Sequence, residues 1–143
     1  KNLKELTKFA CLILEMLNSK NSYHVIALVG NLGSGKTAFV KKLGSLLNIK
    51  EKIVSPTFVL LREYKLSNQK FKVMCHTDLY RLNKISELKT IGLMDYLDDL
   101  NSLVLIEWPK LLENKLPQKT IYIEFNIIDS KHGRNITLYT KNK

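Results

Sequence analysis

A chain of 143 residues, 45% apolar and 25% charged, is long enough to bury the core of one globular domain. No apolar run reaches the roughly 18 residues that a membrane span needs, and the apolar stretch 9–14 stops at Glu15 without a cleavage site of small residues. We therefore expect a single domain over residues 1–143, located in the cytoplasm and with no membrane contact. The formal net charge of +10 allows two interpretations, attraction of a polyanion such as tRNA or lysines spread over a solvated surface.

The first predicted element is an amphipathic helix over residues 3–17, where apolar side chains recur at the i, i+3, i+4 and i+7 spacing. Cys11 lies in this helix, and Cys75 lies in a later apolar segment. Because the chain has no C-x-x-C and no other metal-ligand spacing, we expect both to be buried free thiols. The three histidines are dispersed, so we expect no zinc site.

The apolar run 25–29 leads into Gly-Asn-Leu-Gly-Ser-Gly-Lys-Thr at 30–37, which satisfies the phosphate-loop pattern G-x-x-x-x-G-K-[ST]. Glycines allow positive φ and a close approach to a ligand, so successive backbone N–H groups can surround an anion. The helix that follows, ending near Leu47, adds its positive N-terminal end. Lys36 is then placed to reach the outer phosphates, and the Thr37 hydroxyl to ligate Mg²⁺.

The segment 53–58 contains Pro56, which excludes a regular central strand. A polar Ser-Pro-Thr at 55–57, shortly after a phosphate-loop helix, is where a nucleotide-sensing switch would lie, with Thr57 reaching Mg²⁺ or the γ-phosphate. A turn with a capping hydroxyl explains the same residues equally well. Both interpretations stay open at this point.

The β-rich stretches 58–66 and 71–78 predict a hairpin. Its second strand ends at Asp78, whose carboxylate is placed to touch the water shell of a metal ion, although an Asp at a strand end is more often a turn or cap residue. Arg81 follows and is the best candidate in this chain for stabilising charge on a transferring phosphoryl group.

Residues 86–98 predict a helix that Gly92 bends or breaks. The continuous apolar run 103–106 then predicts a strand that is buried on both faces and ends in Glu107. An acid at this place in phosphate-loop enzymes helps to hold Mg²⁺ or to orient the attacking water. The alternative is a strand-end Glu with a structural role only.

Two further strands are predicted near the C-terminus. Residues 120–127 alternate Ile, Ile, Phe and Ile with Tyr122, Glu124 and Asn126, which predicts a half-exposed strand. A turn over 129–133 and a last strand over 136–139 follow.

Four motifs in this order resemble the bacterial TsaE family: Gly-Asn-Leu-Gly-Ser-Gly-Lys-Thr (30–37), Ser-Pro-Thr-Phe (55–58), His-x-Asp-x-Tyr-Arg-Leu (76–82) and Leu-Ile-Glu-Trp-Pro (105–109). The resemblance runs over most of the chain. It implies a phosphate-loop NTPase-like, three-layer α/β/α fold with a mixed, mostly parallel central sheet. It also implies a Mg²⁺-dependent ATPase that works with a TsaB–TsaD heterodimer, and through that complex indirectly with tRNA, to make N6-threonylcarbamoyladenosine next to the anticodon.

The resemblance also implies a set of site residues. Thr37 and Glu107 fall on Mg²⁺ positions, Asp78 falls on a further acidic position near the metal, and Thr7 and Arg134 fall near the base and sugar. With Arg81 and Thr57 from the reasoning above, the predicted catalytic residues are Lys36, Glu107, Asp78 and Arg81. The predicted ATP-binding residues are Thr7, Asn31, Leu32, Gly33, Ser34, Gly35, Lys36, Thr37, Ala38, Thr57 and Arg134.

Three other functions compete with this ATPase. A small phosphate-loop nucleoside or small-molecule kinase usually brings lid arginines onto the transferred phosphate, and the chain has only three arginines. A GTPase needs the guanine-reading motif N-K-x-D, and the segments 83–86 and 114–117 both lack its Asp. A non-enzymatic RNA-binding module is permitted by the charge, and no other feature supports it.

Overall fold

The computed structural model describes residues 3–20, 23–31, 33–56, 59–67, 70–112, 114–129 and 133–140, and within these ranges six strands form one sheet in the order β2-β3-β4-β1-β5-β6. The four central strands are mutually parallel, and the two edge strands run antiparallel to their neighbours. The sheet is therefore mixed and mostly parallel, as predicted. Its strands are β1 (Val25–Val29), β2 (Leu61–Lys65), β3 (Val73–Asp78), β4 (Ser102–Glu107), β5 (Ile121–Asp129) and β6 (Gly133–Thr140).

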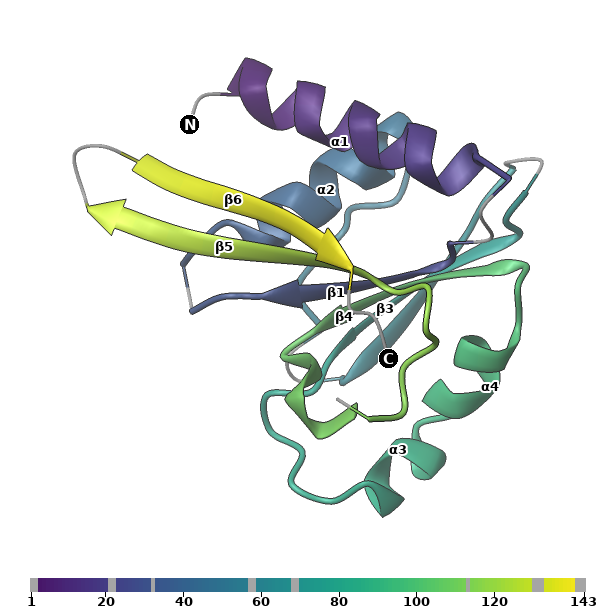
Figure 1. The fold of residues 1–143 in the computed structure, drawn as a ribbon. Coiled ribbons are helices and arrows are strands. Elements are labelled where there is room, and N and C mark those ends of the chain that lie inside the picture. Colours follow the sequence, from purple (N-terminus) through teal and green to yellow (C-terminus); the bar gives the residue numbers. More distant parts are fainter. Residues whose placement is uncertain are drawn as a thin grey trace.

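Helices cover both faces of this sheet and make the three layers that were predicted (Figure 1). One face carries α1 (Leu3–Asn18) and α2 (Lys36–Leu46). The other carries α3 (Ser86–Thr90), α4 (Leu93–Asp98) and the short 3-10 helix η1 (Pro109–Leu112).

Each face of the sheet has its own apolar core. In β4, Leu103 and Leu105 pack with the core under α1 and α2, and Val104 and Ile106 pack with the core under α3 and α4. Successive side chains of a strand point to opposite faces. The continuous apolar run therefore forms a strand that is buried on both faces, as predicted.

The prediction of two buried thiols is half wrong. Cys75 in β3 is buried, and burial raises the pKa of its thiol to about 12, with a smaller contribution from the charge of Glu63. Cys11 in α1 is exposed. The buried stripe of α1 contains Ala10 and Ile13, and one residue along a helix turns the side chain about 100° away from its neighbour.

Two backbone features adjust the predicted elements. The predicted hairpin forms, but β2 begins only at Leu61, because Leu60 has a φ of 71° and interrupts the extended chain. The helical stretch predicted over 86–98 is divided into α3 and α4, since Gly92 adopts a φ of 80° between them.

Burial along β5 differs from the simple alternation predicted for it. Tyr122 is predicted on the exposed face, but it is buried in the core that η1 helps to cover and stacks on Tyr139 of β6, with ring centroids 5.3 Å apart. Ile127 was placed on the buried face, yet 49% of it is exposed. The outer half of the β5–β6 ribbon projects past the end of β1, which explains the exposure of Ile127 (Figure 1).

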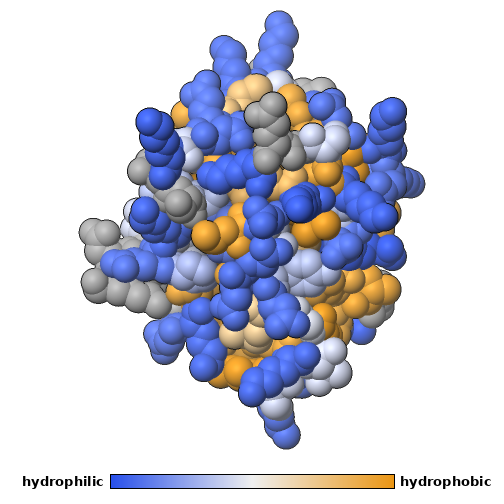
Figure 2. Space-filling view, turned by 90° about the vertical axis from the view of Figure 1, so that its right-hand side faces the viewer, coloured by the Kyte–Doolittle hydropathy of each residue, from blue (hydrophilic) through white to orange (hydrophobic). Residues whose placement is uncertain are grey.

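The surface seen from the right-hand side of Figure 1 is mostly hydrophilic, with apolar side chains gathered in smaller areas between the polar ones (Figure 2). Many long hydrophilic side chains project separately from it. The described residues on this face therefore form several small apolar areas.

Candidate functional site

The connection from β1 to α2 has the geometry of an anion-binding loop. Gly30 has a φ of 150°, and a Cβ on it would lie 2.6 Å from the carbonyl oxygen of Phe125. Gly35 caps α2 with a φ of 107° and offers no side chain to its first N–H groups. The first four N–H groups of an α-helix lack partners within the helix, so this end of α2 has donors for a phosphate.

Ser34 provides independent evidence that the loop is shaped for a polar ligand. Its side chain is 1% exposed, and its Oγ has no hydrogen-bond partner among the described residues. A buried hydroxyl without a partner is costly. Because Ser34 lies inside the loop, this orphaned hydroxyl fits a cradle that is completed by a bound phosphate.

Lys36 is the cation of this loop. Its side chain is buried, its Nζ donates a hydrogen bond to the Gly30 carbonyl oxygen, and the same Nζ lies 3.9 Å from the centroid of the Trp108 ring. Burial lowers the pKa of Lys36, while the negative charges of Glu107 and Asp78 act in the opposite direction. The ammonium group is therefore held between a backbone carbonyl, an aromatic face and two nearby carboxylates.

The two carboxylates come from neighbouring parallel strands. Asp78 ends β3, Glu107 ends β4, and the two residues are paired in register. Both are buried, at 5% and 3% exposure. Asp78 also accepts a hydrogen bond from the Tyr80 N–H at 2.9 Å, so the turn-capping role weighed for it is present and does not exclude a second role beside the loop.

His76 holds the carboxylate of Glu107. Its Nε2 lies 2.6 Å from Glu107 Oε2, and both side chains are buried. His76 begins the motif at 76–82, but the sequence alone gave this histidine no role. The signal was present, because residues two apart in a strand share one face and His76 lies two residues before Asp78.

The donors around Lys36 suit Mg²⁺. Thr37 follows Lys36 at the start of α2, so the loop also contains a hydroxyl oxygen. Hard oxygen donors of this kind are the ligands of Mg²⁺, which usually takes only one or two carboxylates together with phosphate oxygens and waters. In the part of the chain that the structure describes, no group of three His, Cys, Asp or Glu residues could hold a metal by itself.

The backbone at Leu60 is hydrogen-bonded to the end of β3. This contact bears on the interpretation of 55–57 as a switch. The carbonyl oxygen of Leu60 accepts hydrogen bonds from the Asp78 N–H at 3.1 Å and from the Thr77 hydroxyl at 2.5 Å. Thr57 itself lies outside the described residues. The chain that continues from it therefore contacts the end of β3 beside the acidic pair.

The other predicted residues are placed less closely or lie outside the description. Thr7 is half-buried on α1, whose Phe9 packs against Phe39 of α2. Arg81 is exposed in the turn after β3. Asn31, Gly33 and Ala38 are exposed around the loop, whereas Leu32 and the side chain of Arg134 lie outside the described residues.

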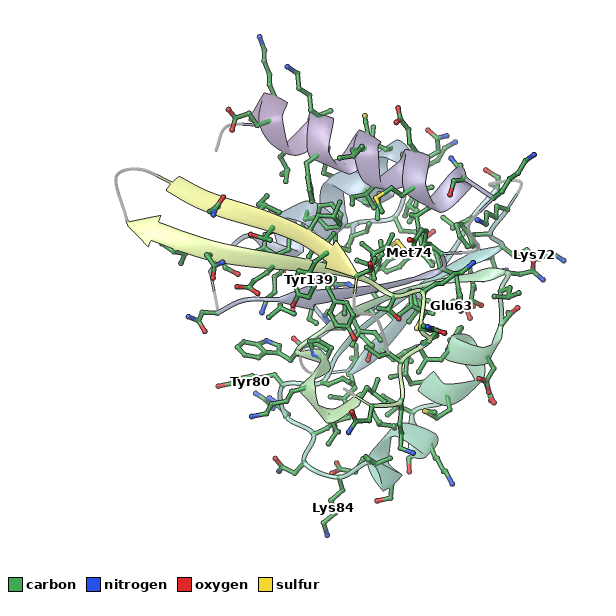
Figure 3. All side chains as sticks on the ribbon, in the orientation of Figure 1. Glu63, Lys72, Met74, Tyr80, Lys84 and Tyr139 are labelled. Atoms are coloured by element: carbon green, nitrogen blue, oxygen red, sulfur yellow. The ribbon has the colours of Figure 1, made fainter. Side chains whose placement is uncertain are left out.

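Trp108 has a larger part in the site than its sequence position suggested. It has a φ of 58°, which is unusual for a residue other than glycine, and its ring contacts both Lys36 and Tyr80, with 4.8 Å between the two ring centroids. Tyr80 is 54% exposed and points outward at the edge of the molecule (Figure 3). Beside Trp108, a hollow of about 490 Å³ lined by Tyr122 and Tyr139 opens from the start of the loop.

The chain was compared with known protein families. The family described as threonylcarbamoyl adenosine biosynthesis protein TsaE matches residues 1–136. The chain belongs to the TsaE family. The TsaE family is one of tRNA threonylcarbamoyladenosine biosynthesis. This member has the phosphate-loop pattern at 30–37.

Individual relatives show the same family. The chain is 36% identical over 115 residues to a tRNA threonylcarbamoyladenosine biosynthesis protein TsaE from Borreliella burgdorferi, a match that covers 80% of each chain. It is 33% identical over 131 residues to the TsaE of Haemophilus influenzae, covering 92% of this chain and 78% of the relative. The crystal structure of YdiB from Bacillus subtilis superimposes with a TM-score of 0.70 at 29% identity, over 98% of this chain and 81% of YdiB.

The helices were also compared with the requirements of a membrane span. None of those in the described part of this TsaE chain combines the length and the apolar composition that crossing a bilayer requires.

Replacement of Gly30 by alanine should destabilise the fold more than the same change at Gly33. Both glycines have positive φ, but only the Gly30 Cβ would meet a backbone atom, whereas the Gly33 Cβ would have nothing within 4 Å. We expect Gly33→Ala to cost about 1–2 kcal/mol of backbone strain, and Gly30→Ala to cost about 1–3 kcal/mol more through the clash. Urea unfolding of both variants measures this, and equal losses would show that the loop relaxes around the added methyl group.

Proposed function

We propose that this TsaE protein binds ATP with Mg²⁺ at the loop 30–37 and hydrolyses it in support of threonylcarbamoyl transfer to tRNA. One observation carries this proposal: Lys36 lies close to two carboxylates that end neighbouring strands. The same loop contains the buried hydroxyl of Ser34, which has no hydrogen-bond partner among the described residues. A site for an anion alone would gain nothing from two buried carboxylates. A site for a phosphate chain together with a divalent cation uses both charges.

In this proposal, each group of residues has a role that follows from its position. Backbone N–H groups of the loop and of the start of α2 bind the phosphates. Lys36 exchanges the Gly30 carbonyl oxygen for the outer phosphates, where its charge is better compensated. Thr37, Glu107 and Asp78 would hold Mg²⁺, which neutralises charge on the transferring group. Glu107, oriented by its buried hydrogen bond, is also placed to direct the attacking water.

The partner in this proposal is the TsaB–TsaD heterodimer, and tRNA is reached through that complex, in the cytoplasm. One support is the pathway that the names of the relatives give. The other is the position of Arg81 in this chain. Arg81, the candidate for stabilising charge on the phosphoryl group, lies exposed in a turn. A docking protein can therefore contact Arg81 directly and turn its side chain toward the phosphates. The backbone at Leu60, which contacts the end of β3, can transmit the state of the nucleotide.

Lys36→Ala should remove tight ATP binding. Lys36 is the buried cation of the loop, and a charge-assisted hydrogen bond contributes roughly 1.5–3 kcal/mol, so we expect affinity to fall at least tenfold. Isothermal titration with ATP and Mg²⁺ measures the loss. Lys41→Ala, an exposed lysine on the same helix, is the control and should bind as the unmodified protein does. An unchanged affinity in Lys36→Ala would refute the assignment of the loop.

Glu107→Gln should leave ATP bound but slow its hydrolysis by roughly 10²-fold or more, because the loop is intact while metal and water positioning are lost. Titration gives the affinity, and single-turnover phosphate release gives the rate. Glu15→Gln, on the exposed face of α1, serves as the control. If affinity and turnover fell together, Glu107 would be a structural residue of the strand end.

The TsaB–TsaD pair should accelerate ATP hydrolysis, and ATP should favour its docking over ADP. An arginine that becomes positioned on the transferring phosphoryl group is worth roughly 10³–10⁵ in rate, so Arg81→Ala should remove most of the acceleration. Arg62→Ala, an exposed arginine on the edge strand β2, should not. The measurements are ATPase rates and pull-downs with purified partners. An isolated protein that turns over as fast as the mixture and docks equally with either nucleotide would contradict the proposal.

A further inference from the structure

We infer that His76 is a positioning residue for the metal and water chemistry, acting through the carboxylate of Glu107. This inference rests on the proposed function, because it gives Glu107 a task beside Mg²⁺. It concerns a side chain that would not itself touch nucleotide or metal. What the histidine would provide is the direction in which the carboxylate points.

The geometry for this role is built into two neighbouring strands. His76 and Asp78 lie two residues apart on β3, so they share the face of the sheet that α2 covers, as do Leu105 and Glu107 on β4. The His76 ring is fully buried, and its Nε2 lies 2.6 Å from Glu107 Oε2. An ionised carboxylate can only accept, so the inference assigns the ring proton to Nε2. The hydrogen bond engages one carboxylate oxygen and thereby sets the direction of the other, Oε1.

The surroundings of the ring show that packing alone does not explain a histidine here. Its second nitrogen, Nδ1, is buried and has no hydrogen-bond partner among the described residues. Met74 and Leu105, the neighbours of His76 on this face, belong to the apolar core. An apolar side chain would leave no such orphaned nitrogen and would suit this core better. The polar contact that the ring does make goes to Glu107.

A second buried histidine shows the contrasting case. His24 lies just before β1, and its Nδ1 contacts the carbonyl oxygen of Ser102 at 3.0 Å. Ser102 begins β4 and Glu107 ends it, so the two histidines contact opposite ends of the same strand. His24 joins backbone elements far from the loop and offers a matched control for the loss of a buried imidazole.

Oriented carboxylates are typical of metal sites. The groups that hydrogen-bond to metal ligands fix their orientation, and losing one typically costs 10–100-fold in metal affinity or activity. Asp78, at the end of β3, is paired in register with Glu107 at the end of β4. β3 therefore carries both an acid for the site and the group that orients the acid on the next strand.

The test compares His76→Gln with His76→Met. The two side chains are alike in length, but only glutamine keeps an N–H donor for Glu107. We expect His76→Met to weaken Mn²⁺ binding in the presence of ADP, followed by electron paramagnetic resonance, by about 10–100-fold. kcat for ATP should fall with it, whereas ADP binding without metal should be unchanged. His76→Gln should recover most of both losses, and His24→Met should alter neither.

The inference would be overturned if His76→Met had the same Mn²⁺ affinity and the same kcat as the unmodified protein. Equal losses in the Met and Gln variants would overturn it too, because the donor would then not matter. If His76→Met does not fold, a measurement on the unmodified protein still tests the inference. Nitrogen-detected NMR of the histidine rings should show the proton of His76 on Nε2, and a proton on Nδ1 alone would refute the inference.

Failure of the proposed function has a different signature. An unmodified protein that bound neither ATP nor Mn²⁺ with ADP would refute the nucleotide site, whatever the tautomer of His76. If the unmodified protein and His76→Met bind and hydrolyse ATP equally well, only the role of His76 is refuted.

Discussion

Parallel pairing of β3 with β4, and of β4 with β1, is the constraint on which the site depends. Parallel strands end at the same edge of a sheet, so this pairing delivers Asp78, Glu107 and the start of the loop at Gly30 to one place. Hydrogen bonds along the strands set the register, which makes Asp78 and Glu107 direct neighbours. The positions of these groups are thus set by the strand pairing of the sheet core.

Charge at this edge is balanced in a way that suits a phosphate chain with a cation. Burial disfavours the ammonium of Lys36, and the carboxylates of Glu107 and Asp78 offset part of that cost. Phosphates alone would be repelled by the two acids, and a cation alone would be repelled by Lys36. A magnesium–nucleotide pair satisfies both. The Gly30 carbonyl and the Trp108 ring give the Lys36 ammonium two partners within the protein.

Features that depend on neighbours in the chain could be predicted from the sequence. The helix over 3–17, the buried run that became β4, the hairpin and the break at Gly92 all follow from periodicity or from one special residue. Contacts between distant residues could not. The buried Tyr122 and the hydrogen bond of His76 to Glu107 each depend on which other element packs against that position.

The sequence by itself determined the loop, because the glycines, Lys36 and Thr37 are consecutive and their chemistry is local. It also placed an acid at the end of each of two apolar strands. Only the tertiary structure decided that these strands are adjacent and in register, and that His76 and Trp108 belong to the same site. The physical reason is that strand order and register are chosen by the packing of the whole sheet between two helical layers, and this choice maximises burial over many residues at once.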